Sequence, residues 1–265
     1  MDHAATTPVD PRVVEAMLPY WKDRYGNASS VYALGREAHH ALHEARLTVA
    51  EFLNCEPREV IFTSCGTESD NLALRGVAFE RRHRAKKNHI ITSPIEHHAI
   101  SHTIEQLVDF FGFEATYVPV DRHGLVEPAD VEKAIRPDTA LISIMYANNE
   151  VGTIEPVADI GEIARAHKVP FHTDAVQAGG TLSLNVKALN VDLLSLSAHK
   201  FYGPKGVGVL YVRRGVPLLP VQTGGGHERN RRAGTENVAY AIGLATALRL
   251  AYAEAEEANA RVAAL

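Results

Sequence analysis

Short apolar runs alternate along the chain with longer segments whose apolar residues recur every three or four positions. Several short runs are apolar nearly throughout, which is typical of strands covered on both faces of a sheet. The pattern predicts strands at residues 60–63, 89–92, 115–120, 140–145, 169–173, 192–197 and 208–212. Because strands that alternate with helices form parallel sheets, we predict an α/β fold with a mostly parallel, doubly wound sheet.

Four segments carry helix signals. Asp10 is a predicted N-cap with Pro11 at the first helical position. Further helices are predicted at about 35–53 and 156–167, where apolar residues share one face. Residues 236–265 predict one long alanine-rich helix.

Composition narrows the class of protein. The 265 residues are 46% hydrophobic, enough for one large or two small domains, and carry a net charge of -5 that argues against nucleic-acid binding. The two cysteines exclude a disulfide framework and a four-cysteine zinc site, which favours a cytoplasmic location. We find no apolar run long enough for a membrane span and no secretory signal at the start of the sequence.

Candidate chemistry follows three of the predicted strands. Residues 64–70 combine small hydroxyl-bearing side chains with a glycine before a helix, which predicts an anion site or, alternatively, a capping box of Thr67 and Asp70. Asp174 ends an apolar strand, where it is either a helix N-cap or a buried acid that needs a cationic partner such as a protonated ring nitrogen.

Lys200 follows the strand at 192–197 and precedes a glycine-rich turn. Burial would lower the pKa of its ammonium group and make it a Schiff-base candidate, whereas the alternative is a surface lysine in a turn. Three features thus follow one another along the chain: an anion site, a buried acid and a desolvated lysine. Together they predict a pyridoxal phosphate pocket.

Motifs of one enzyme family occur along the chain, at 2–10, 63–72, 96–99, 148–152, 174–177, 197–200, 224–228 and 232–237. Together they resemble the cysteine desulfurases of the NifS/IscS type, which are class V, fold-type I pyridoxal phosphate enzymes. The resemblance extends over essentially all 265 residues.

The resemblance implies a role for each catalytic position. Lys200 would bind the cofactor aldehyde and shuttle protons, and Asp174 would pair with the pyridinium nitrogen. Gln177 and Asn149 would contact the phenolic oxygen of the ring, with Asn149 also near the substrate carboxylate. His97 would stack on the ring and act in acid–base steps.

The same resemblance implies a phosphate site shared by two subunits. Gly66 and Thr67, with Ser197 and His199, would hold the cofactor phosphate. Thr235 would contact the phosphate bound by the neighbouring subunit of a homodimer. The implied substrate is L-cysteine, whose sulfur would form an enzyme persulfide and pass to an iron–sulfur scaffold or another acceptor protein while alanine is released.

Domain boundaries follow from the same comparison: 1–15 as the N-terminal segment of a small domain, 16–240 as the cofactor domain, and 241–265 as the start of a connecting helix. The family's nucleophilic cysteine and substrate-binding arginine lie beyond the region matched, and neither Cys55 nor Cys65 corresponds to that cysteine. We therefore expect a truncated chain that binds the cofactor but turns over L-cysteine poorly.

Two other functions remain open at this stage. One is a different class V enzyme, such as a selenocysteine lyase or an aminotransferase; the other is a non-catalytic cofactor-binding or dimerisation domain. The histidine pairs His39/His43 and His98/His102 have helical spacing but no evident third ligand, so no metal site is predicted. The basic run at 81–87 is interpreted as a solvated helix end.

Overall fold

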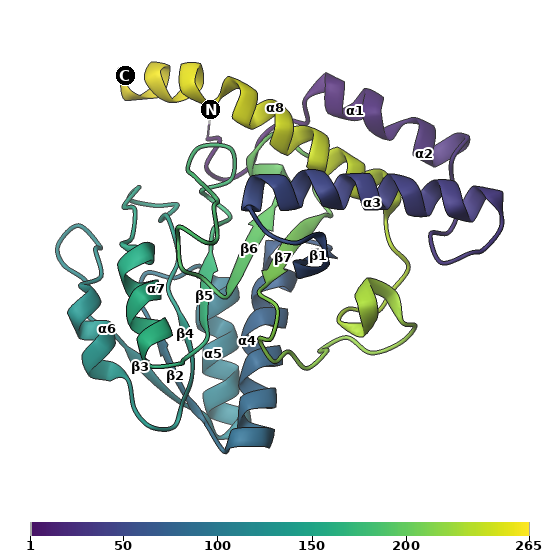
Figure 1. Ribbon diagram of the computed structural model, residues 1–265. Coiled ribbons are helices and arrows are strands. Elements are labelled where there is room, and N and C mark those ends of the chain that lie inside the picture. Colours follow the sequence, from purple (N-terminus) through teal and green to yellow (C-terminus); the bar gives the residue numbers. More distant parts are fainter. Residues whose placement is uncertain (1, 265) are drawn as a thin grey trace.

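All of the predicted apolar runs form strands of one sheet. The computed structural model describes residues 2–264, and Figure 1 shows the arrangement of their elements. The strands are β1 (Val60–Thr63), β2 (His89–Thr92), β3 (Glu114–Tyr117), β4 (Thr139–Ser143), β5 (Phe171–Asp174), β6 (Leu193–Ser197) and β7 (Gly208–Val212). They form a seven-stranded sheet in the order β1-β7-β6-β5-β4-β2-β3. Only β7 runs antiparallel to its neighbours, so the mostly parallel sheet is confirmed.

Two strands end earlier than predicted. The strand expected at 115–120 ends at Tyr117, and the strand expected at 140–145 ends at Ser143. Val118 still donates its amide to Thr92, at 2.8 Å, but Pro119 has no amide to continue the ladder.

The helices are α1 (Pro11–Met17), α2 (Pro19–Lys22), α3 (Ala33–Leu53), α4 (Gly66–Ala85), α5 (His98–Phe111), α6 (Pro128–Ala134), α7 (Val157–Ala166) and α8 (Val238–Ala263). The predicted start of α1 is confirmed, because the Asp10 carboxylate accepts the Arg12 amide at 2.8 Å. Helix α8 runs without interruption across residue 240, where the domain boundary is predicted. Within residues 2–264 we find no helix with the length and apolarity needed to cross a bilayer.

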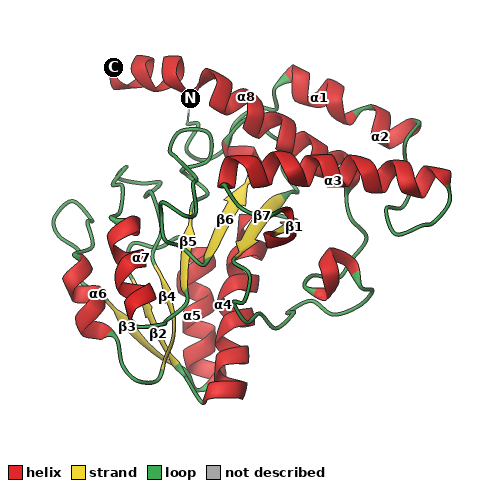
Figure 2. Cartoon of the chain, viewed as in Figure 1, coloured by secondary structure: helices red, strands yellow, loops and turns green. Residues whose placement is uncertain are grey.

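Apolar side chains project from both faces of the sheet, as the continuous apolar runs predict. Along β1, Val60 and Phe62 join the core that contains α3, α7 and α8, whereas Ile61 joins the core beneath α4 and α5. Figure 2 shows helices on both faces of the sheet. The doubly wound arrangement is therefore confirmed.

The N-terminal segment is tied to the end of β6. The Thr7 amide donates to the His199 carbonyl and the Asp10 amide to the Tyr202 carbonyl, each at 3.0 Å. Helix α1, which follows this segment, packs along α8. Residues 2–10 therefore lie beside the turn that carries Lys200, although most strands of the sheet come between them in the sequence.

Candidate active site

A cavity of about 740 Å³ opens where the parallel strands end. Asp174 is the last residue of β5 and Ser197 the last of β6, while His97 and Asn149 lie in the loops after β2 and β4. Ligands gather at this edge of an open parallel sheet. Nine of the ten predicted site residues line the cavity: Gly66, Thr67, His97, Asn149, Asp174, Gln177, Ser197, His199 and Lys200.

Lys200 lies in a short 3-10 turn directly after β6 and points into the cavity. Its ammonium group donates to the Ala4 carbonyl and, at 3.0 Å, to the Ala5 carbonyl. Burial lowers the pKa of Lys200, and the negative charges of Asp174 and Asp2 oppose that shift. A lowered pKa increases the share of neutral amine, which is the nucleophilic form.

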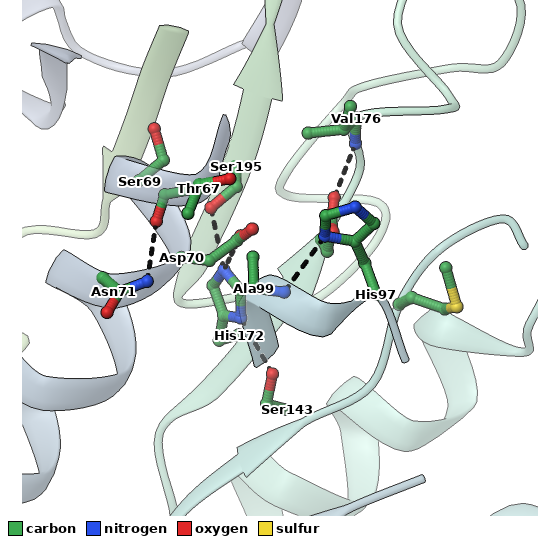
Figure 3. Close-up of polar contacts among 12 residues, drawn as sticks. Thr67, Ser69, Asp70, Asn71, His97, Ala99, Ser143, His172, Val176 and Ser195 are labelled. Carbon is green, nitrogen blue, oxygen red and sulfur yellow. Dashed lines mark hydrogen bonds and ion pairs between the residues drawn. The ribbon is translucent and has the colours of Figure 1, made fainter. Parts of the chain in front are cut away.

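Asp174 is 5% exposed, and one of its carboxylate oxygens accepts the Val176 amide at 2.9 Å (Figure 3). Burial raises the pKa of Asp174, while this hydrogen bond and the positive charge of Lys200 act against the rise. Residues 176–181 form turns rather than a helix, so the helix N-cap interpretation is wrong. A buried carboxylate at a cavity wall suits a ligand that brings a positive charge.

His97 caps helix α5 through its ring. Its Nδ1 accepts the Ala99 amide at 3.1 Å, as Figure 3 shows. Since Nδ1 accepts, a proton on the neutral ring must be at Nε2. The cap therefore orients the imidazole at the cavity wall and sets its tautomer.

The start of α4 leaves amide donors at the cavity. The N-cap is Cys65, whose Sγ accepts the Glu68 amide at 3.4 Å and whose carbonyl accepts the Ser69 amide at 3.1 Å. The amides of Gly66 and Thr67 have no acceptor among residues 2–264. Helix N-terminal amides without partners form an anion site. This favours the interpretation of residues 64–70 as an anion site over the capping box.

The predicted capping box of Thr67 and Asp70 is wrong. The helix begins one residue before Thr67, and Glu68 rather than Asp70 accepts a backbone amide from outside the helix, that of Ser64 at 2.7 Å. Asp70 therefore lies within the helix, where it is 1% exposed and faces the cavity.

Gly66 allows the turn to lie against the neighbouring strands. A Cβ at this position would lie 2.8 Å from Val176 Cγ2 and 3.3 Å from Ser197 Cβ. Any side chain there would have to displace the opposite wall of the amide cradle. The glycine thus keeps the space that an anion at α4 requires.

Two amide side chains complete the wall near Lys200. Gln177 donates to the Ala4 carbonyl at 3.0 Å, so it shares this acceptor with Lys200. Asn149 donates to the Glu150 carboxylate at 3.0 Å. Opposite them, burial and the charges of Lys200 and Lys205 lower the pKa of His199, whose Nδ1 lies 3.1 Å from Thr6 Oγ1.

Thr235 is the predicted site residue that does not line this cavity. It lies in the loop between β7 and α8 and lines two separate surface pockets, one with Tyr20 and Trp21 and one with Phe62. Its predicted contact with a neighbouring subunit stays a prediction.

Several cavity residues were not predicted from the sequence. Asp2, Ala4 and Ala5 belong to a motif noted above, but the backbone carbonyls of the two alanines carry no signal in their side chains. Asp70 could have been found from the spacing of an acid four residues after Gly66, which places it on the helix face toward the sheet.

The cysteines and histidine pairs carry no evident chemistry. Burial raises the pKa of Cys55 to about 12, so its thiol is unreactive at neutral pH. Cys65 is occupied as the cap of α4. Across residues 2–264, no three side chains among histidine, cysteine, aspartate and glutamate are grouped closely enough to hold a metal ion.

The mostly parallel seven-stranded sheet, with a lysine and a buried acid at its carboxyl edge, has the fold of the fold-type I pyridoxal phosphate enzymes. The chain belongs to the class V aminotransferase family, whose sequence profile matches residues 1–265. Class V aminotransferases and cysteine desulfurases depend on pyridoxal phosphate.

Within this family, the chain is similar to cysteine desulfurases. Cysteine desulfurase IscS of Methanosarcina thermophila is 56% identical over 259 residues, which are 98% of this chain and 63% of that relative. A solved NifS-like protein superposes with a TM-score of 0.93 at 46% identity, over 97% of this chain and 70% of that one. The structure of SspA in complex with cysteine has a TM-score of 0.90 at 43% identity, over 94% of this chain and 71% of that one.

Proposed function

We propose that this chain is the pyridoxal phosphate-binding region of a cysteine desulfurase, which transfers the sulfur of L-cysteine to a thiol and releases L-alanine. In the overall reaction the carbon–sulfur bond of cysteine breaks, a sulfur–sulfur bond forms at the acceptor thiol, and the thiol proton replaces sulfur on the β-carbon. One observation carries the proposal: a single cavity contains Lys200, Asp174 and the unpaired amides at the start of α4.

The residues at this cavity fit the cofactor group by group. The free amides of Gly66 and Thr67 suit its phosphate, and the missing Cβ of Gly66 keeps that space open. Asp174 suits a protonated ring nitrogen because its buried carboxylate forms no ion pair with any of residues 2–264. Lys200 supplies the amine for the aldehyde. Bound at these groups, the cofactor supplies an electron-withdrawing ring that stabilises negative charge on the substrate's α-carbon.

Residues of this chain then handle protons and orientation. Lys200, with its lowered pKa, accepts and returns a proton at its Nζ. His97 presents Nε2 to the cavity because Nδ1 is occupied by the Ala99 amide. The amide groups of Gln177 and Asn149 are placed to orient polar substituents of the ring and substrate.

The assembly and partners belong to the same proposal. A homodimer is supported by Thr235, which lies outside its own chain's cavity on an arginine-rich loop. L-Cysteine as substrate is supported by the similarity to a protein solved with cysteine. The proposal also includes a cytoplasmic location and transfer of sulfur to an iron–sulfur scaffold or another acceptor protein.

Reconstitution with pyridoxal phosphate tests the cofactor assignment. The wild-type chain should gain an absorbance band near the visible–ultraviolet boundary that Lys200→Ala abolishes. Lys205→Ala, a matched change at an exposed lysine of the same turn, should keep the band. Retention of the band in Lys200→Ala, or its equal loss in both variants, would contradict the assignment.

Product analysis tests the reaction. With L-cysteine we expect only slow alanine release, because the Cys55 thiol is held protonated by burial and Cys65 caps a helix. An added thiol should increase alanine and persulfide together. Transamination of L-cysteine, or release of selenide from L-selenocysteine without sulfur transfer from L-cysteine, would identify a different class V enzyme.

A further inference from the structure

Asp70 is a buried acid at the cavity wall that the proposed chemistry does not use. It lies in α4, is 1% exposed and lines the same cavity as Asp174 and Lys200. Neither carboxyl oxygen has a hydrogen-bond partner among residues 2–264. An ionised carboxylate without partners in such a place is strongly destabilising, so Asp70 requires either a cation or a proton.

The nearest basic group to Asp70 does not supply a cation. His172 Nε2 lies 3.7 Å from an Asp70 oxygen, too far for a hydrogen bond. The two ring nitrogens of His172 instead face Ser143 Oγ at 2.9 Å and Ser195 Oγ at 3.0 Å, an arrangement that Figure 3 shows. Complete burial lowers the pKa of His172 to about 3, so its ring is neutral in the physiological range.

The other titratable neighbours make ionisation of Asp70 harder. Burial raises the pKa of Asp70 well above its usual value, and the negative charge of Asp174 adds to the rise. Glu96 is itself held protonated by burial, which raises its pKa to about 8.

We propose that Asp70 is a positioning residue of the cofactor cavity: a neutral carboxylic acid whose bound proton leaves the neighbouring Asp174 as the single charged carboxylate for a ring nitrogen. The proposal rests on the cofactor assignment made above. Two carboxyl groups at one buried wall cannot both ionise without mutual repulsion, and the more deeply buried one keeps the proton. His172, fixed by two serine hydroxyls, provides the neutral polar surface against which this acid lies.

The cofactor-free chain tests the protonated state. Unfolded Asp70 ionises near pH 4, whereas the folded residue keeps its proton to higher pH. The wild type should therefore lose stability as pH rises above about 4, and Asp70→Asn should lose less. We expect the Tm difference between them to be constant below about pH 4 and to grow by roughly 5 °C up to pH 7.

The matched control is Asp109→Asn, which removes an exposed acid from α5. Its Tm curve should run parallel to the wild-type curve. If the Asp70→Asn curve is also parallel from pH 4 to 8, Asp70 is not protonated in the folded chain and the proposal is overturned. The test needs no cofactor, so its failure is distinct from loss of the Lys200 absorbance band.

The pairing of the two acids is tested in an Asp174→Asn background. Without the Asp174 charge, ionisation of Asp70 becomes easier and the pH-dependent gain from Asp70→Asn should shrink. An unchanged gain would show that burial alone holds the proton on Asp70, which would overturn the paired arrangement.

Positioning is tested with the absorbance of the reconstituted chain. Asp70→Asn keeps a neutral polar group, so the pH midpoint of the absorbance change should stay within about 0.3 units of the wild type. Asp70→Leu keeps the branched shape but removes the polar group, and should move the midpoint by about one unit, a tenfold change in proton affinity. Equal shifts in both variants, or none in Asp70→Leu, would overturn the positioning role.

Discussion

Replacing Arg46 by Met should destabilise the chain strongly because it breaks a buried ion pair that supports the arginine-rich loop. Two guanidinium nitrogens of Arg46 donate to the Glu228 carboxylate, at 2.7 and 2.8 Å, and one also donates to the Val60 carbonyl. The two side chains are only 7% and 1% exposed. The guanidinium group also lies 4.8 Å from the centre of the Phe62 ring.

The magnitude follows from the charge that is left behind. Removing one partner of a buried pair costs about 3–5 kcal/mol, because the other charge stays buried without compensation. For a chain of this size that corresponds to a fall in Tm of roughly 10 °C. At the ion pair, Glu228, Arg229 and Asn230 have left-handed backbones with φ of 43°, 56° and 62°. Such conformations persist only where surrounding contacts impose them.

Urea and thermal unfolding of Arg46→Met measure this loss. Adding Glu228→Gln to Arg46→Met should recover part of it, because the unpaired charge is then gone. The control is Arg24→Met, which removes an exposed arginine paired with Glu37. Its stability should stay close to that of the wild type. If Arg46→Met unfolds no more easily than this control, the ion pair does not hold the loop and the reasoning is refuted.

Two smaller changes test the cavity and its surroundings. Gly66→Ala should weaken pyridoxal phosphate binding by about tenfold or more in an absorbance titration, because the added Cβ would meet Val176 and Ser197; wild-type affinity would contradict the amide cradle. Cys55 should resist alkylation at neutral pH until the chain is unfolded, because burial raises its pKa to about 12; mass spectrometry of the alkylated folded chain would reveal the opposite result.

The fold was largely predictable because its signals are local. Seven apolar runs became seven strands, and both the Asp10 cap and the long helix from about residue 236 lie where the sequence places them. Strand ends were less predictable, as at Ser143, where pairing depends on the neighbouring strand. Asp174 and Lys200 were identifiable since each directly follows an apolar strand, and strand ends of a parallel sheet share one edge.

The remaining parts of the site depend on contacts that a local pattern does not encode. The start of α4 was misplaced because cysteine is not a usual N-cap, and this shift turned Asp70 from a supposed cap into a buried acid. The carbonyls of Ala4 and Ala5 are invisible to motif analysis, since their side chains take no part.

The contact between Lys200 and the N-terminal segment explains why site and fold are linked. The lysine meets the Ala4 and Ala5 carbonyls across 196 and 195 positions of sequence, and the Thr7–His199 backbone bond fixes that approach. In the folded chain these groups are held together while β6 pairs within the sheet and α1 packs against α8. A cofactor that binds Lys200, Asp174 and the α4 amides at once therefore has its full site only in the folded chain. Binding should accordingly raise the Tm, by an amount that depends on ligand concentration.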